Sequence, residues 1–503
     1  MEPFGTITNF YPFLSEETRS IVQSVLQDAE GYDDFVERLI DVCRTLDIAI
    51  DFAFFTAIQS FFTSSTEHQR KLRHYLESDV VLEPWSLIFS EEYFEDWETR
   101  FPSALNKALE NLKEDWMRFH ILLLGLNSPK IIDRQDFHKQ AEDFLMEHPN
   151  LKCFSSYIYY MLGREQNVEW DAEKAIEQYN QALRSAELFN DEVKIADYQS
   201  AIAGVLKDSN IFEAIDILEK SYQKYAAFGC TCNKHIAASN MGLFHTIIGE
   251  YDLALEFYYI SFERELSLYA KEILATVLTR VFCETNNPKQ AMEWTEWTFD
   301  DKVTTNLLID RLEKEQLYST IFFSLAVARI LIQVGQVEGV SRLLDAIHKT
   351  VLKRGFDLEY MAHNTVLGLF DIATGKLVEG FGILEDALAE AERLNSQVYV
   401  NSLLLELTKA EVKHFEKLDS KSTTESSGPW MTRFERHARE KNYSGIQMQH
   451  ALLKAEYQEM IGETDAAQLT LQDALTFTDS PGVKTLRKRI QERLQKLEAS
   501  VDI

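Results

Sequence analysis

The stretch Gly249-Glu-Tyr-Asp-Leu-Ala-Leu-Glu-Phe-Tyr258, together with residues Ala237 to Ile248 before it, decides the fold. An apolar helical pattern ends at a glycine, the chain reverses within two or three residues, and a second amphipathic pattern begins. This arrangement is typical of a helical hairpin. The same turn glycine recurs at Gly335, Gly375 and Gly462.

The spacing of these glycines predicts a repeat. Gly335 and Gly375 are 40 residues apart, and the intervals on either side, 86 and 87 residues, are close to two such steps. Within the first double step the turn falls at Asn286, and Asn is the next best residue after Gly for the left-handed conformation that ends a helix. The chain is therefore predicted to be a stack of helix pairs.

Length and composition favour an elongated repeat array. A chain of 503 residues exceeds what one globular core supports. It contains only 19 Gly and 9 Pro, and apolar residues recur at helical spacing almost throughout, so we expect little or no sheet.

The charge of the chain argues against nucleic acid as a main partner. There are 51 basic and 81 acidic side chains, which give a formal charge of −30. A field of that sign repels phosphate backbones. Residues 1–90 carry 15 acidic and 6 basic side chains, which also disfavours a helix-turn-helix DNA-binding domain at this end.

Cysteine usage and hydropathy indicate a cytoplasmic protein. The five cysteines are odd in number and scattered, as in reducing compartments. The first residues are acidic and polar, unlike a signal peptide. The most apolar run, residues 48–62, includes Asp51 and Gln59 and is too short to span a bilayer, so we expect a buried helix and no membrane insertion.

A family resemblance appears from residue 157 onward. Leu162-Gly163 is followed by Ala175, Tyr179 and Ala182 at the spacing of the tetratricopeptide pattern. Two further units repeat this pattern, the second with substitutions: Met241-Gly242, Ala254, Tyr258 and Ser261, and Leu367-Gly368, Gly380, Leu384 and Ala387. The chain therefore resembles a divergent tetratricopeptide (TPR-like) repeat protein. Small residues at these places let the helices of a pair approach closely.

The resemblance implies an all-α fold, a right-handed superhelical α-solenoid of stacked antiparallel helix pairs. We expect an N-terminal helical region over residues 1–150, which is either a cap or a set of atypical helix pairs. TPR-like repeats follow over residues 151–480, with a mobile Ser/Thr-rich insert at 419–429. Residues 481–503 form a C-terminal capping helix.

This last helix is amphipathic. One face carries the apolar residues Val483, Leu486, Ile490, Leu494 and Leu497, and the other carries six basic residues. Such a helix could read anionic membranes or RNA. A lid over the last exposed hydrophobic surface of a solenoid is the interpretation we favour.

Motifs for catalysis are scarce. The sequence contains no His-Glu-x-x-His, no Gly-x-Ser-x-Gly and no phosphate-binding Gly-x4-Gly-Lys. Cys230, Cys232 and His235 are the one cluster with metal-ligand elements, but a structural zinc site needs four ligands. Free thiols at a helix start are the alternative that we favour. We therefore expect a non-enzyme without cofactor or metal.

The resemblance also implies a concave groove lined by the first helix of each pair, where TPR-like proteins hold peptides or helices of partners. Projecting those helix faces places eight residues in the groove: Tyr157, Tyr160, Arg164, Gln199, Ser239, Leu243, Thr365 and Leu369. The acidic surface favours a basic partner.

Three functions remain open. The favoured one is a non-catalytic scaffold or adaptor that binds a protein or peptide partner. The first alternative is a peptide- or signal-sensing cytoplasmic regulator with residues 1–150 as its output module. The second is an enzyme whose pocket no motif reveals.

Overall fold

The computed structural model describes residues 16–30, 34–35, 38, 42, 134–147, 155–168, 171–188, 190–262, 268–299, 302–315, 318–355, 357–415 and 428–501. Every regular element in these ranges is a helix, as predicted. The chain divides into two compact units, Met1–Ala237 (unit 1) and Ala238–Ile503 (unit 2).

Unit 1 contains α2 (Glu16–Asp28), α10 (Arg134–Glu147), α11 (Ser155–Val168), α12 (Ala172–Leu188), α13 (Glu192–Leu206), α14 (Ile211–Ala227) and the first turns of α15 (Thr231–Ile248). Unit 2 contains the rest of α15, α16 (Tyr251–Ser261), α17 (Leu268–Glu284), α18 (Pro288–Phe299), α19 (Thr305–Glu315), α20 (Tyr318–Gln333), α21 (Val340–Arg354), α22 (Asp357–Ala373), α23 (Leu377–Arg393), α24 (Gln397–Lys413), α25 (Pro429–Glu440), α26 (Ser444–Met460), α27 (Thr464–Ala474), the 3₁₀ turn η3 (Pro481–Val483) and α28 (Lys484–Val501).

The turns predicted from sequence end helices in the left-handed conformation. The backbone φ angle is +82° at Gly249, +77° at Gly335, +95° at Gly375 and +85° at Gly462. Asn286 adopts +60° and replaces glycine as expected. Three further asparagines do the same at turns that the glycine spacing does not mark, with φ of +53°, +51° and +55° at Asn190, Asn395 and Asn442.

The helix pairs pack as TPR-like hairpins. A Cβ atom added to Gly163 would lie 2.6 Å from the Tyr179 ring, so only glycine lets α11 approach α12 this closely. Gly242 bears the same relation to Tyr258, also at 2.6 Å. In the third TPR-like repeat, a Cβ atom added to Gly368 would lie 2.8 Å from the Leu384 side chain. These three contacts confirm that the small residues of the pattern mark sites of close helix approach.

In unit 1 the described helices α11 to α14 pack in chain order, each against the next. Tyr179 of α12 lies in one apolar cluster with Ile202 and Val205 of α13. Tyr198 of α13 packs with Ala182 and Ala186 of α12. The arrangement is that of a repeat array, in which each element contacts its neighbours.

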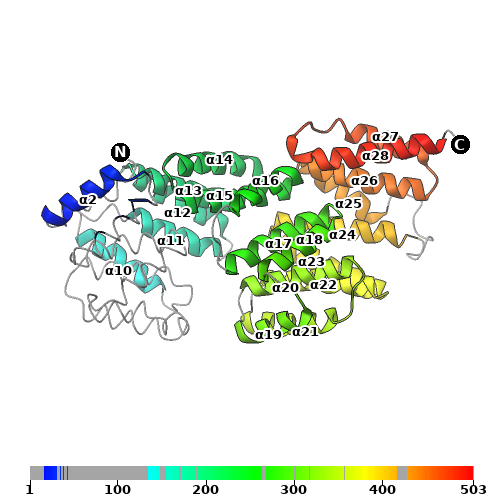
Figure 1. The fold of residues 1–503 in the computed structure, drawn as a ribbon, viewed down its shortest axis with the longest axis horizontal. Helices are drawn as coiled ribbons and strands as arrows, with labels where there is room; N and C mark the ends of the chain where they lie inside the picture. The colour runs from blue at the N-terminus through cyan, green and yellow to red at the C-terminus, as the bar shows by residue number, and fades with distance from the viewer. Residues whose placement is uncertain are drawn as a thin grey trace. The chain divides into compact units, whose positions relative to one another are not determined.

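Unit 2 contains a layer of first helices. In this layer α17 packs on α20, α20 on α22, α22 on α24 and α24 on α26 (Figure 1). The second helices α18, α21, α23, α25 and α27 each pack against the first helix of their own pair. The additional helix α19 packs on α20 and α21.

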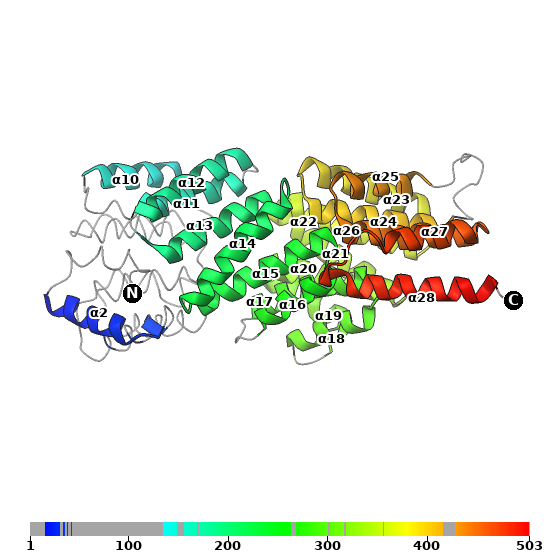
Figure 2. The same ribbon diagram turned by 90° about the horizontal axis from the view of Figure 1, so that it is seen from above.

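The end of unit 2 returns to its beginning, which the sequence did not reveal. Gly249 and Gly445 touch through their backbones, and a Cβ on Gly249 would lie 2.6 Å from the Gly445 carbonyl carbon. The Tyr251 hydroxyl lies 3.1 Å from Glu284 Oε2 and 3.0 Å from Gln449 Oε1. Figure 2 shows α16 beside the start of α28. We call this set of contacts the closure of unit 2.

The C-terminal helix caps unit 2 as predicted. Its five predicted apolar residues are all buried: Val483, Leu486, Ile490, Leu494 and Leu497. They belong to one core cluster with residues of α16, α17, α26 and α27, so the helix also covers the start of the unit. On the basic face, Arg493 pairs with Glu459 at 2.6 Å and Arg489 donates to the Thr285 carbonyl at 3.4 Å.

Several expectations fall on residues that the structure does not describe. They include the apolar run 48–62, residues 419–427 of the insert predicted at 419–429, and most of residues 1–150. The division at residues 150 and 480 therefore stays a prediction. In the described part of the chain, no helix is long and apolar enough to cross a bilayer.

Candidate functional site

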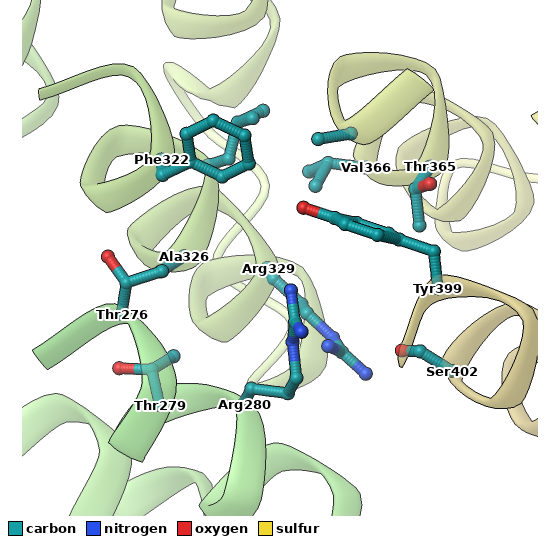
Figure 3. A pocket seen from close by; sticks show the side chains of 12 residues that line it. Thr276, Thr279, Arg280, Phe322, Ala326, Arg329, Thr365, Val366, Tyr399 and Ser402 are labelled. Atoms are coloured by element: carbon teal, nitrogen blue, oxygen red, sulfur yellow. The ribbon is translucent and has the colours of Figure 1, made fainter. Parts of the chain in front are cut away.

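The layer of first helices in unit 2 contains a small hollow of about 50 Å³ (Figure 3). Twelve residues line it: Thr276, Thr279 and Arg280 from α17, Phe322, Leu325, Ala326 and Arg329 from α20, Ala362, Thr365 and Val366 from α22, and Tyr399 and Ser402 from α24. The hollow thus occupies the face where the TPR-like pattern places a groove.

Arg280 and Tyr399 form the most distinctive pair in the hollow. Figure 3 shows Arg280 extending from α17 towards the ring of Tyr399, which projects from α24 across from Phe322. The guanidinium carbon lies 4.9 Å from the ring centroid, within range of a cation–π contact. Burial raises the pKa of Tyr399, which remains a neutral phenol at physiological pH. Among the described residues, no carboxylate forms an ion pair with half-buried Arg280.

Arg329, by contrast, is fully engaged. Its Nη2 lies 2.8 Å from Glu406 Oε1, and its Nη1 lies 4.0 Å from Glu284 Oε1. Lys409 adds a contact of 3.0 Å to Glu406. Burial opposes ionisation of Glu406, but Lys409 and Arg329 outweigh it and lower its pKa to about 2. Arg329 is therefore part of a buried ion-pair network that joins α17, α20 and α24.

The remaining wall is largely apolar. Phe322, Ala326 and Val366 present hydrocarbon to the hollow. The hydroxyls of Thr276 and Thr365 donate to carbonyls of their own helices, to Glu272 at 2.8 Å and Met361 at 2.9 Å. These two hydroxyls are therefore already hydrogen-bonded and add few free donors to the hollow. The hollow offers hydrocarbon surface with one guanidinium beside an aromatic ring.

Thr279 differs from the other two threonines of the wall. Its side chain is 1% exposed, and its Oγ1 has no hydrogen-bond partner in the described structure. A buried hydroxyl without a partner is uncommon, because desolvation costs about 1 to 3 kcal/mol. It is a group that a bound ligand or water could satisfy.

The lining does not include the groups of a hydrolytic or metal site. None of the twelve lining residues is a His, Cys, Asp or Glu. Elsewhere in the described residues, no three such side chains gather as a metal site requires. What the hollow can do chemically is bind: it offers a cation, an aromatic face and apolar surface.

The eight residues projected into a groove fall in both units. Thr365 lines the hollow, and Leu369 follows one turn later on α22 and is half-buried. Ser239 and Leu243 lie on α15 and are also half-buried. Leu369, Ser239 and Leu243 are not among the residues that line the hollow.

The other four lie in unit 1, where the structure places three of them together. Tyr157, Tyr160 and Arg164 lie on one face of α11, with the Tyr rings 6.4 Å apart and the Arg164 guanidinium 6.0 Å from the Tyr160 ring. Tyr160 also packs 5.2 Å from Tyr198 of α13. Gln199 follows on α13, and its buried Oε1 has no hydrogen-bond partner among the described residues.

Sequence reasoning missed Arg280, Phe322 and Tyr399. It projected only hairpins that contain a Leu-Gly pair or its close variants, and α17, α20 and α24 lack that pair. One signal was present: Arg280 stands between Thr279 and Val281 in the most apolar part of its helix. A lone charge in an apolar first helix is a useful marker of a groove.

The possible zinc cluster remains open. Cys230 and His235 are both buried, with exposed fractions of 2% and 3%. The side chain of Cys232 lies outside the described structure, so the cluster stays an untested alternative.

Comparison with known proteins adds two distant similarities. The chain matches no protein-family model and no curated protein. Among solved structures it is similar to the apo form of the quorum sensor NprR from B. thuringiensis, with 12% identity, a TM-score of 0.43, and coverage of 75% of this chain and 99% of that one. It is also similar to a Rap protein complexed with competence and sporulation factor, with 13% identity, a TM-score of 0.34, and coverage of 82% and 97%. Both TM-scores are below 0.5, and the conclusions below depend on the contacts of this chain alone.

Proposed function

We propose that this protein is a non-catalytic scaffold or adaptor that binds a peptide segment of a partner protein in the hollow of unit 2. The observation that carries the proposal is the pairing of Arg280 with Tyr399 in a largely apolar hollow on the first helices. A guanidinium that faces an apolar hollow without a carboxylate beside it is available to bind an anionic group.

Peptide binding explains the shape of the site better than catalysis does. Four helices supply the lining, and they are held in place by the ion pairs of Arg329 and by the helix contacts of the layer. A rigid, apolar site with few polar groups binds without a large ordering cost. Ser402 could act as a nucleophile only with a base beside it, and the lining supplies none.

The setting we propose is the cytoplasm. Cys283 is a buried free thiol, which fits a reducing compartment. The charge of −30 would speed association with a partner of basic overall charge.

The test is selection of peptides on the purified full-length protein from a displayed random library, followed by calorimetry. Val366→Trp fills the hollow, whereas Val378→Trp places the same ring on α23, where Val378 is 82% exposed. We expect selected peptides to lose at least about tenfold in affinity with Val366→Trp and to be unaffected by Val378→Trp. Failure to select any peptide, or equal binding to both variants, would contradict the proposal.

A further inference from the structure

We infer that the hollow recognises a carboxylate of the bound peptide through Arg280, next to an apolar side chain of the same peptide. The inference rests on the proposed function and specifies the chemistry of its ligand. Its basis is the contrast between the two arginines of the lining.

The two arginines share an environment but not a partner. Arg329 holds Glu406 at 2.8 Å and also lies 4.0 Å from Glu284. Arg280, from the neighbouring helix, contacts Tyr399 through its ring and by a hydrogen bond, and it forms no ion pair among the described residues. A charge withdrawn from water needs a compensating anion more than a surface charge does. The structure therefore holds one guanidinium whose anion is still to be supplied.

The acidic side chains of the layer cannot supply it without breaking other contacts. Glu406 also accepts from Lys409 at 3.0 Å, and its pKa of about 2 reflects how strongly these cations hold its charge. Glu284 lies 3.1 Å from the Tyr251 hydroxyl in the closure of unit 2. Moving either carboxylate to Arg280 would remove an ion pair of Arg329 or a hydrogen bond of Tyr251. The anion must come from outside the layer.

The geometry at Arg280 suits a carboxylate. The Arg280 guanidinium carbon lies 4.9 Å from the centroid of the Tyr399 ring, and Arg280 also hydrogen-bonds Tyr399, so its other N–H groups remain to donate to a ligand. A carboxylate accepts two parallel N–H bonds from such an edge. Tyr399 also limits the motion of the side chain, so less freedom is lost on binding.

The wall beside Arg280 specifies the neighbouring group. Phe322 and Val366 present hydrocarbon in the same hollow, so an aliphatic or aromatic side chain would pack there while the carboxylate reaches Arg280. This local requirement is compatible with a partner of basic overall charge. Steering by exposed charges acts over about one Debye length, roughly 8 Å at physiological salt, whereas the Arg280 contact acts at hydrogen-bond distance.

Two sources of carboxylate share this chemistry: the C-terminus of a peptide and an Asp or Glu side chain. The experiment therefore takes each peptide selected on the wild-type protein in three forms: unchanged, with an amidated C-terminus, and with its acidic residues changed to amides. Binding of each is measured to the wild type, to Arg280→Gln and to Arg342→Gln. Arg342 is an exposed arginine of α21 and provides the matched control.

We expect Arg280→Gln to weaken the unchanged peptide by about 10- to 100-fold and Arg342→Gln to have no effect. The form that lacks the recognised carboxylate should bind weakly and equally to the wild type and to Arg280→Gln. Weaker binding of the peptide with an amidated C-terminus would identify the C-terminal carboxylate as the recognised group. Weaker binding of the peptide whose acidic residues are changed to amides would identify an Asp or Glu side chain. Circular dichroism checks the fold, and Arg280→Lys, which keeps the charge but not the planar edge, should give an intermediate affinity.

If Val366→Trp abolishes binding but Arg280→Gln does not change it, the hollow is the peptide site and the carboxylate inference is wrong. Selection of phosphorylated peptides whose carboxylates are dispensable would also overturn it. If neither variant changes binding, the proposed function fails as well.

Discussion

The two units use the same hairpin in different ways. In the described part of unit 1, each helix from α11 to α14 packs on the next one along the chain. In unit 2 the final helices return to the first, so that Gly445 contacts Gly249 and Thr485 donates to Asp252. Nearest-neighbour packing lets stability add up repeat by repeat, whereas contacts between distant segments tie the whole unit together. The closure includes Glu284 of α17, a helix that also lines the hollow.

The largest expected effect comes from breaking the closure. Gly445→Val would place a side chain against the backbone of Gly249, which cannot move without reorienting the turn. We expect a loss of at least about 4 kcal/mol in the unfolding free energy of unit 2. Hydrogen exchange should rise in α16 and α28 and remain unchanged in α12 to α14.

Gly382→Ala is the matched control for this change. Gly382 lies in α23, and a Cβ there meets nothing within 4 Å. The replacement should be neutral or stabilise by up to about 1 kcal/mol, because alanine favours helix. Equal effects of Gly445→Val and Gly382→Ala would show that the closure contributes little.

Acid should weaken unit 2 through two buried histidines. Burial lowers the pKa of His437 to about 4, and the positive charges of Lys441 and Arg433 add to this shift. Burial likewise lowers the pKa of His450 to about 4, although the carboxylate of Glu435 opposes the shift. Lys454 and Arg439 also act on His450 in the same direction as burial.

The sign follows from proton binding. Between about pH 6.5 and pH 4 the unfolded chain binds protons at these rings and the folded chain does not, so stability falls as the pH falls through this window. Each histidine accounts for a loss on the order of 3 kcal/mol. Urea unfolding at pH 7, 5.5 and 4.5 checks this prediction. The unfolding free energy should depend less on pH in His437→Gln than in the wild type. A pH-independent midpoint for unit 2 would contradict the prediction.

A smaller and more local effect is expected in unit 1. Gly163→Ala would bring a Cβ within 2.6 Å of the Tyr179 ring and push α11 away from α12. The cost should be about 1 to 3 kcal/mol, confined to unit 1. Gly204→Ala, where a Cβ meets nothing within 4 Å, is the control in the same unit. Loss of protection in α26 or α28 as well would contradict this prediction.

The features that could be predicted from sequence are those fixed by nearby residues. The turn at Gly249 requires a positive φ, and the close approach of the Tyr179 ring requires a glycine sixteen residues earlier, at Gly163. Each requirement involves residues of a single hairpin. The buried face of α28 follows from the spacing of Leu486, Ile490 and Leu494. Each of these is a local periodicity, and the structure confirms the helices that they predict.

The closure and the hollow could not be predicted in this way. Position 445 requires glycine because a Cβ atom there would clash with the backbone of Gly249, which lies far away in sequence. No residue near Gly445 in sequence indicates that contact. The meeting of Arg280 with Tyr399 depends on the order in which α17, α20, α22 and α24 stack. Of the residues projected into a groove, Thr365 lies in the hollow because it belongs to that layer.

The most direct measurement of the central claim is site-specific photo-crosslinking to a peptide selected on the wild-type protein. A photoreactive phenylalanine analogue replaces Phe322 in the lining of the hollow or, in a second variant, Val378 on the exposed surface of α23. The account predicts a crosslinked peptide from position 322, competed by unlabelled peptide, and none from position 378. A peptide that crosslinks at 378 and not at 322 would contradict binding in the hollow of unit 2.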